Sequence, residues 1–269
     1  LGADDGGEAA LTYTWSTVGT PPATPTYSRN GNNAAKQATV TFKAAGEYTF
    51  QAAIKDRSGP AVTSSVAVTV LQTATSIALS PTSLRINPGA SKTFTAVVRD
   101  QFVKPMVPQP PVDFSVSGGG TVTTGGVFRA GNVPGGPYTL TAACGTVSAT
   151  ANITVNAAPT IATPAAVSAN PVTGTNVNAG VLGADDSGEA ALTYTWSATG
   201  PATVTFSPNK SNVARNTKAG FTRPGSYTLK VVVKDAQALT AQSTVAVTVV
   251  ATPVRVVVSP ATVALDPLA

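Results

Sequence analysis

The sequence predicts an all-β chain of tandem antiparallel β-sandwiches in a linear array. Short segments alternate apolar residues with Thr, Ser or Lys, and clusters of Gly and Pro separate these segments. In the segment 227–234, Tyr227, Leu229, Val231 and Val233 share one side of the expected strand. No segment shows the long 3.6-residue periodicity of an amphipathic helix, so turns at regular intervals favour sandwiches.

A long internal repeat organises the chain. Residues 1–16 and 182–197 differ only at Gly6 and Ser187. Further along, the segment GEYTF at residue 46 returns as GSYTL at residue 225, and VAVTV returns in the same register. The repeat spans about 180 residues, whereas one sandwich takes about 100. Each repeat is therefore predicted to hold two sandwiches.

Aromatic residues mark the expected cores. A Tyr stands two residues after a Gly, at the start of an apolar strand, in three places: Tyr48, Tyr138 and Tyr227. Such a Tyr forms the tyrosine corner of immunoglobulin-like sandwiches, in which its hydroxyl bonds back to the backbone. Another aromatic residue precedes each of them on the presumed central strand: Trp15, Phe114 and Trp196. We expect these aromatic rings to be buried.

Composition excludes several classes of function. There is no His, so Ser–His, Cys–His and His–metal sites are excluded. The Lys and Arg residues behind the net charge of +5 are scattered, which argues against a nucleic-acid partner. Cys144 is alone and can form no intrachain disulfide, and no apolar run is long enough for a membrane span. We therefore expect no enzyme and no bound cofactor other than a metal ion.

Two acidic loops are the candidate metal sites. They occupy equivalent places in the repeat and comprise Asp4, Asp5 and Glu8 in one copy and Asp185, Asp186 and Glu189 in the other. Clustered carboxylates repel one another unless a cation such as Ca²⁺ offsets their charge. The alternative is a solvated turn in which an Asp side chain caps the backbone. A pair of catalytic carboxylates, as in a glycosidase, is the least favoured interpretation.

Particular segments resemble two bacterial families. The segment 184–196 (ADDSGEAALTYTW) and the segment 224–235 (PGSYTLKVVVKD) are similar to a PKD-type domain. The segments 76–100, 112–122 and 135–145 are similar to a bacterial Ig-like (BIg) domain. The resemblance divides the chain into 1–72 (PKD-like), 73–156 (BIg), 157–250 (PKD-like) and 251–269 (first strand of a further BIg-like domain). Neither Trp15 nor Trp196 is followed by the WDFGDG-like turn of PKD domains, so these copies are divergent.

The two ends of the chain suggest incomplete sandwiches. The first copy starts inside the LGADD motif, and we expect it to lack its first two strands. The last segment carries Val254–Val258, a strand with no domain of its own. Unpaired strand edges invite another chain. The partner is thus expected to be another copy or repeat, either through head-to-tail strand sharing or within a continuous chain.

The resemblance implies a structural or adhesive role. Domains of these families act as spacers, stalks and adhesive arms, so we expect an extracellular bacterial fibre, filament or surface stalk on the cell surface. The alternative is a carbohydrate- or surface-binding accessory region of a large secreted enzyme, with cell-surface glycans as partners. Fold alone does not decide between them.

Overall fold

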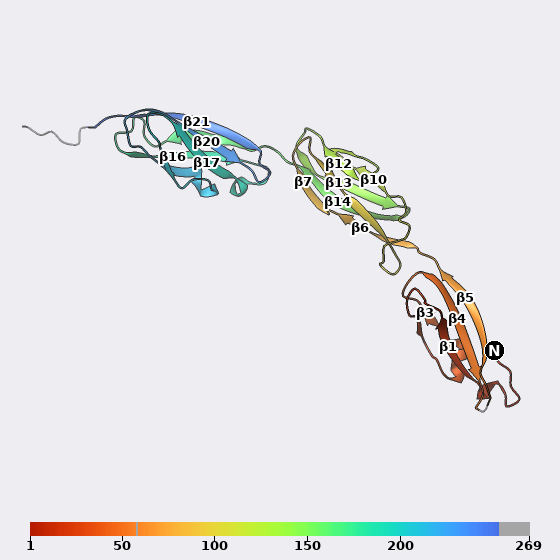
Figure 1. Cartoon of the computed structure of the whole chain (residues 1–269). Helices are drawn as coiled ribbons and strands as arrows, with labels where there is room; N and C mark the ends of the chain where they lie inside the picture. Colours follow the sequence, from red (N-terminus) through yellow and green to blue (C-terminus); the bar gives the residue numbers. More distant parts are fainter. Residues whose placement is uncertain (58, 253–269) are drawn as a thin grey trace, which may run out of the picture. The chain divides into compact units, whose positions relative to one another are not determined.

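The computed structural model describes residues 1–57 and 59–252, and these residues form an all-β structure (Figure 1). The helical segments among them are single 3-10 turns. Two compact units divide the described chain: one comprises 1–84, 91–130 and 136–153, and the other comprises 85–90, 131–135 and the residues from 154 onward. Three sandwiches are formed, and the middle one belongs to the first unit except for short stretches assigned to the second.

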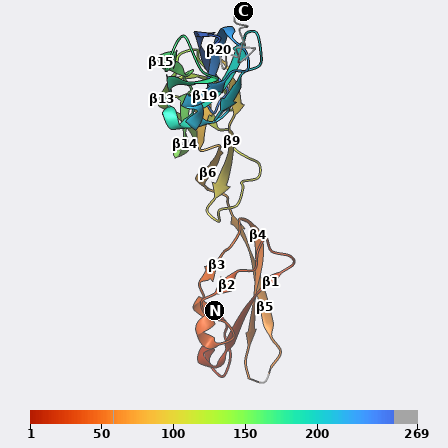
Figure 2. The same cartoon turned by 90° about the vertical axis from the view of Figure 1, so that its left-hand side faces the viewer.

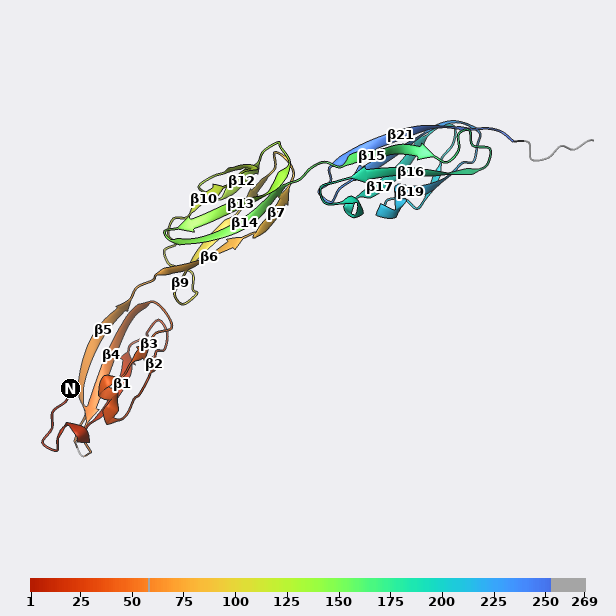
Figure 3. The ribbon, with the colours of Figure 1, turned by 180° about the vertical axis from the view of Figure 1, so that it is seen from behind.

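The third sandwich, in the second unit, is built from two antiparallel sheets (Figure 3). One sheet has the order β15-β16-β19-β18, and its strands are β15 (Thr160–Val167), β16 (Asn176–Ala184), β19 (Asn216–Gly220) and β18 (Thr205–Ser207). The other has the order β17-β20-β21, and its strands are β17 (Thr193–Thr199), β20 (Gly225–Lys234) and β21 (Thr240–Val249). The short turns η3 (Glu189–Ala191) and η4 (Asn212–Arg215) lie between strands.

The core of this sandwich confirms the predicted alternation. Tyr194, Leu229, Val231 and Val233 are fully buried, and Trp196 is only 3% exposed. Each of these large side chains stabilises the fold by roughly 1.5–3 kcal/mol through removal of apolar surface from water. The indole of Trp196 also donates a hydrogen bond to the carbonyl oxygen of Ala214, at 2.8 Å. The central aromatic ring is therefore fixed by both packing and polar contact.

The first sandwich, in the first unit, repeats the second of these sheets but has a smaller partner sheet (Figure 2). The three-stranded sheet β1-β4-β5 consists of β1 (Thr12–Val18), β4 (Gly46–Lys55) and β5 (Val62–Val70). The partner is the pair β2 (Thr26–Tyr27) and β3 (Val40–Thr41), with the turns η1 (Glu8–Ala10) and η2 (Asn33–Gln37) beside them. Among the described residues of 1–72, no strand stands where β15 and β16 cover the third sandwich.

This difference explains the exposure of apolar residues in the first sandwich. Trp15 is only half-buried although its copy Trp196 is buried, so the expectation of full burial is wrong for Trp15. Val66 of β5 is 50% exposed, whereas Val245 at the matching place of β21 is half-buried. The side of the sheet that faces the core is therefore open in the first sandwich, and we call it the open face, made by Trp15, Val62 and Val66.

The middle sandwich lies in the first unit, apart from the ends of three of its strands. Its sheets have the orders β10-β13-β14-β7, β11-β12-β8 and β6-β9. The strands are β6 (Ala74–Ser80), β7 (Ser83–Ile86), β8 (Ser91–Thr93), β9 (Thr95–Asp100), β10 (Asp113–Val116), β11 (Gly120–Val122), β12 (Val127–Ala130), β13 (Gly135–Cys144) and β14 (Val147–Val155). Phe94, Val98, Phe128 and Ile153 are buried.

The expected burial of Phe114 and Tyr138 is wrong, because both rings are half-buried. Phe114 lies on β10, which is an edge strand of its sheet. The ring of Tyr138 lies against Gly119, where an added Cβ would come within 2.3 Å of it. Tyr138 therefore packs over a turn rather than inside the core.

Two of the three predicted tyrosine corners are confirmed. The Tyr48 hydroxyl donates to the carbonyl oxygen of Ala44, and the Tyr227 hydroxyl donates to that of Arg223, both at 2.8 Å. Among the described residues, the hydroxyl of Tyr138 has no such acceptor. The predicted strand Val254–Val258 lies outside the described residues.

Candidate functional site

Glu189 of the acidic loop is the centre of a hydrogen-bonded cluster. Its Oε1 accepts hydrogen bonds from the Tyr194 hydroxyl at 2.9 Å and from Nδ2 of Asn212 at 3.2 Å. Its Oε2 pairs with Nη1 of Arg215 at 2.7 Å. Asn212 also donates to the carbonyl oxygens of Glu189 and Leu192, so it ties the loop to the start of β17. The carboxylate is thus already satisfied by N–H and O–H donors.

The first copy repeats this cluster with Lys36 in place of Arg215. Glu8 Oε1 accepts from Tyr13 at 3.0 Å and from Asn33 at 3.2 Å, and Glu8 Oε2 pairs with Lys36 at 2.7 Å. The hydrogen bond from Lys36 holds the pKa of Glu8 below its ordinary value, against the opposing effect of burial. We call the two arrangements the Glu clusters. They stabilise the loop that precedes the central strand.

The Asp residues of the loops have separate surroundings. Asp4 and Asp185 each accept a hydrogen bond from the backbone N–H two residues later, which is an Asx turn. Asp5 is exposed. Asp186 pairs with Arg85, which belongs to the same compact unit, at 2.8 Å. The other oxygen of Asp185 is buried without a hydrogen-bond partner.

The structure does not bring these carboxylates to one point. Ca²⁺ takes six to eight oxygen ligands, whereas the carboxylates of Glu8 and Glu189 face nitrogen donors. The described residues contain no group of three or more His, Cys, Asp or Glu side chains suited to a metal ion. The side chains in this arrangement therefore do not form a calcium site. Calcium binding stays a prediction, to be tested by adding Ca²⁺ to the protein. The geometry matches the alternative of a capped turn.

Side-chain amides close the free edges of several strands. Asn209 accepts from the backbone N–H of Trp196 at 2.8 Å and donates to its carbonyl oxygen at 3.0 Å, as a neighbouring strand would. Asn30 does the same for Trp15, at 2.7 and 2.8 Å. In the middle sandwich, Gln109 forms the same pair of bonds with Val98. We call these residues the amide caps, and they block pairing at edges that would otherwise attract another strand.

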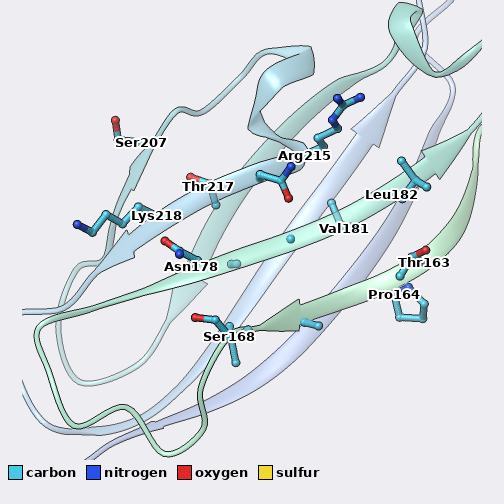
Figure 4. Close-up of a pocket in the computed structure, with 15 residues that line it drawn as sticks. Thr163, Pro164, Ser168, Asn178, Val181, Leu182, Ser207, Arg215, Thr217 and Lys218 are labelled. Atoms are coloured by element: carbon cyan, nitrogen blue, oxygen red, sulfur yellow. The ribbon is translucent and has the colours of Figure 1, made fainter.

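A shallow groove crosses the outer face of the sheet β15-β16-β19-β18 (Figure 4). Its volume is about 830 Å³. The strand registers place Gly180 between Ala166 on β15 and Asn216 on β19. This row has small side chains at two of three places, so it forms the floor. We call this feature the trough.

The walls of the trough differ in chemistry. One wall is a polar row across the sheet, and Figure 4 shows its members in one line: Ser207, Lys218, Asn178 and Ser168. The opposite wall is more apolar and contains Leu182, which is 40% exposed, with Thr163 and Pro164. The pairing of β15 with β16 shifts register on both sides of Thr163, and such bulges bend a strand. The bend opens the trough at this end.

The sequence reasoning missed the residues that complete the Glu clusters and the amide caps. A comparison of the two copies held the signal, because both contain the pattern N-x-x-N-x-x-K/R. The first copy has Asn30, Asn33 and Lys36, and the second has Asn209, Asn212 and Arg215. The first Asn caps the edge, the second holds the loop, and the cation pairs with Glu.

Comparisons with known proteins agree with the sandwich architecture of one segment. Residues 169–249 match the family described as K319L-like, PKD domain. No curated protein matches the chain. Among the described residues, no helix has the length and apolar character needed to cross a membrane.

Several solved structures are similar at low identity. Drosophila OTK extracellular domains 3–5 show 14% identity and a TM-score of 0.36, with coverage of 90% of this chain and 86% of that chain. Mouse cadherin-23 EC22-24 shows 16% identity and a TM-score of 0.37, with 91% and 88% covered. Surface layer protein SbsC, domains 4–9, shows 18% identity and a TM-score of 0.31, with 92% of this chain and 41% of that chain covered.

Proposed function

We propose that this chain is a structural or adhesive segment of an extracellular bacterial fibre, filament or surface stalk, and that it is not an enzyme. The observation that carries the proposal is the identity of the two Glu clusters and of their amide caps. The contacts that recur in both copies are those that stabilise a sandwich. Repetition of stabilising contacts is typical of repeat domains that serve as spacers or attachment segments.

The favoured partner is another copy or repeat of the same protein. The open face of the first sandwich presents apolar side chains, with Val66 50% and Val62 69% exposed. In the third sandwich, β15 and β16 cover the matching face, and Val172 pairs with Val249. Strands of this kind fit the open face, whether a longer continuous chain or a neighbouring copy supplies them in a head-to-tail contact.

A chain extended ahead of Leu1 by the residues 159–181 tests this partner assignment. Trp15 should become buried, its emission should shift to the blue, and concentration-dependent association should fall in sedimentation velocity. A matched extension of the same length and composition in scrambled order serves as the control. Unchanged emission and association with the native extension would show that the open face does not select these strands.

The rival function is a surface-binding accessory region of a large secreted enzyme. The trough on the third sandwich is the observation that favours this function, because it hollows the outer face of the sheet β15-β16-β19-β18. Protease treatment of intact source cells tests the extracellular location independently of any binding activity. Cleavage of the chain on intact cells supports the extracellular assignment, and full protection beside a cleaved surface marker would contradict it.

A further inference from the structure

The trough offers side chains rather than backbone to a ligand. β16 and β19 are the central strands of their sheet, and both edges of each are paired. A peptide strand therefore finds no free N–H or C=O groups along the floor with which to pair. A ligand at this place must be recognised through hydroxyl, amide and ammonium groups on the polar wall.

The polar wall suits a hydroxyl-rich chain. Ser207, Lys218 and Asn178 lie on neighbouring strands, and Ser168 directly follows β15. The row therefore extends over three inter-strand spacings, or about 14 Å. The small residues Gly180 and Ala166 keep the floor low, and the side-chain amide of Asn216 lies beside Gly180, where it adds a polar group for a sugar ring. Leu182 and Pro164 face the trough with apolar surface, which matches the C–H face of a sugar ring.

The charge of the trough favours anionic over neutral hydroxyl-rich chains. Its lining contains Lys218 and Arg215 and no carboxylate. Arg215 is paired with Glu189, whereas Lys218 has no ion pair within the described part of the chain. No aromatic ring lines the trough to stack on a neutral sugar. The attraction must therefore come from Lys218 acting on an anionic group, aided by the net charge of +5.

We propose that the trough of the third sandwich binds an acidic polysaccharide, with Lys218 pairing with the carboxylates of its uronic acid residues and with Gly180 and Ala166 leaving room for the sugar ring. The biological relevance of this ligand rests on the proposed extracellular location, whereas the binding itself does not. The trough is a surface that the first sandwich does not have, because no strand among the described residues of 1–72 matches β15 and β16.

Native affinity electrophoresis of the whole chain tests the proposal. The gel contains polygalacturonate as the acidic probe or dextran as the neutral one, at low ionic strength. We expect retardation by polygalacturonate only. Lys218→Gln should weaken binding about tenfold, since one charged hydrogen bond is lost. Gly180→Leu should weaken it similarly by filling the floor.

The control variants distinguish specific binding in the trough from non-specific electrostatic attraction to the positively charged chain. Lys234→Gln removes one exposed charge from β20 of the opposite sheet and should leave binding unchanged. Ala166→Leu fills the floor at a second position if Gly180→Leu disturbs folding, which Trp196 emission reports. No retardation, equal retardation by dextran, equal loss in Lys234→Gln, or full binding by both filled variants would overturn the proposal. These variants do not change the protease test on intact cells. A failure of polysaccharide binding can therefore be distinguished from a failure of the extracellular assignment.

Discussion

Removal of an amide cap is a sharp test of how the sandwich edges are protected. In Asn209→Ala, the backbone N–H and carbonyl oxygen of Trp196 lose partners at 2.8 and 3.0 Å. Each bond contributes about 0.5–1.5 kcal/mol, and water at the half-buried edge replaces part of this. We expect the free energy of unfolding of the third sandwich to fall by about 1–2 kcal/mol.

Tryptophan emission isolates the affected sandwich. The chain has two Trp residues, so Trp15→Phe leaves Trp196 as the single reporter. In urea, a loss of about 1–2 kcal/mol should lower the unfolding midpoint by roughly 0.5–1 M. The exposed edge should also increase self-association in sedimentation velocity.

Asn178→Ala is the matched control, because Asn178 lies on the outer face of the other sheet and its side chain has no hydrogen-bond partner among the described residues. It should leave both readouts unchanged. If the urea midpoint of Asn209→Ala equals that of Asn178→Ala and its sedimentation is unchanged, the side-chain amide does not replace a neighbouring strand at this edge.

Three further predictions concern the aromatic cores and the acidic loops. Trp196→Ala should cost about 3–5 kcal/mol as a core truncation and Trp15→Ala clearly less, because Trp15 is half-buried; equal losses in urea unfolding followed by circular dichroism would contradict this. The pKa of Glu8 is lowered in the folded state by Lys36, so its stabilising effect is present above the carboxyl pKa of the unfolded chain, about 4.3, and is lost as the pH falls through the folded value. Glu8→Gln should therefore flatten the acid dependence of melting of the first sandwich, and an unaltered pH profile would count against the cluster. The calcium prediction for the two acidic loops requires millimolar Ca²⁺ to raise the melting temperature relative to a chelator, and an unchanged temperature rejects it.

The sequence predicted strands and repeats well because their signals are local. Alternation along 227–234 identifies the buried side of β20, and the tyrosine corners at Tyr48 and Tyr227 follow from a short pattern. The exposure of Phe114 could not be predicted, since it depends on β10 being an edge strand. Edge and centre are set by long-range pairing, which no local pattern specifies.

The acidic loops show the corresponding limit for sites. Sequence proximity suggested that Asp185, Asp186 and Glu189 share a ligand, but the fold directs them to three different partners. Arg85 lies 101 residues away from Asp186 in the chain, so that ion pair could not be predicted from spacing. The trough likewise depends on register between strands, because Gly180 becomes a floor only where Ala166 and Asn216 stand beside it.

The alternation of unlike sandwiches has a consequence for biosynthesis. Near-identical domains on one chain sit at millimolar effective concentration with respect to each other, and exchange of matching strands between them is a characteristic misfolding route of repeat proteins. The middle sandwich differs in its strand pairing from the two similar sandwiches that flank it in the sequence. A ribosome therefore completes an unrelated domain before the second copy emerges. The first copy's amide cap at Trp15 is then already in place, so the edge of β1 offers no template to the nascent strands of the second copy, and only the open face stays accessible.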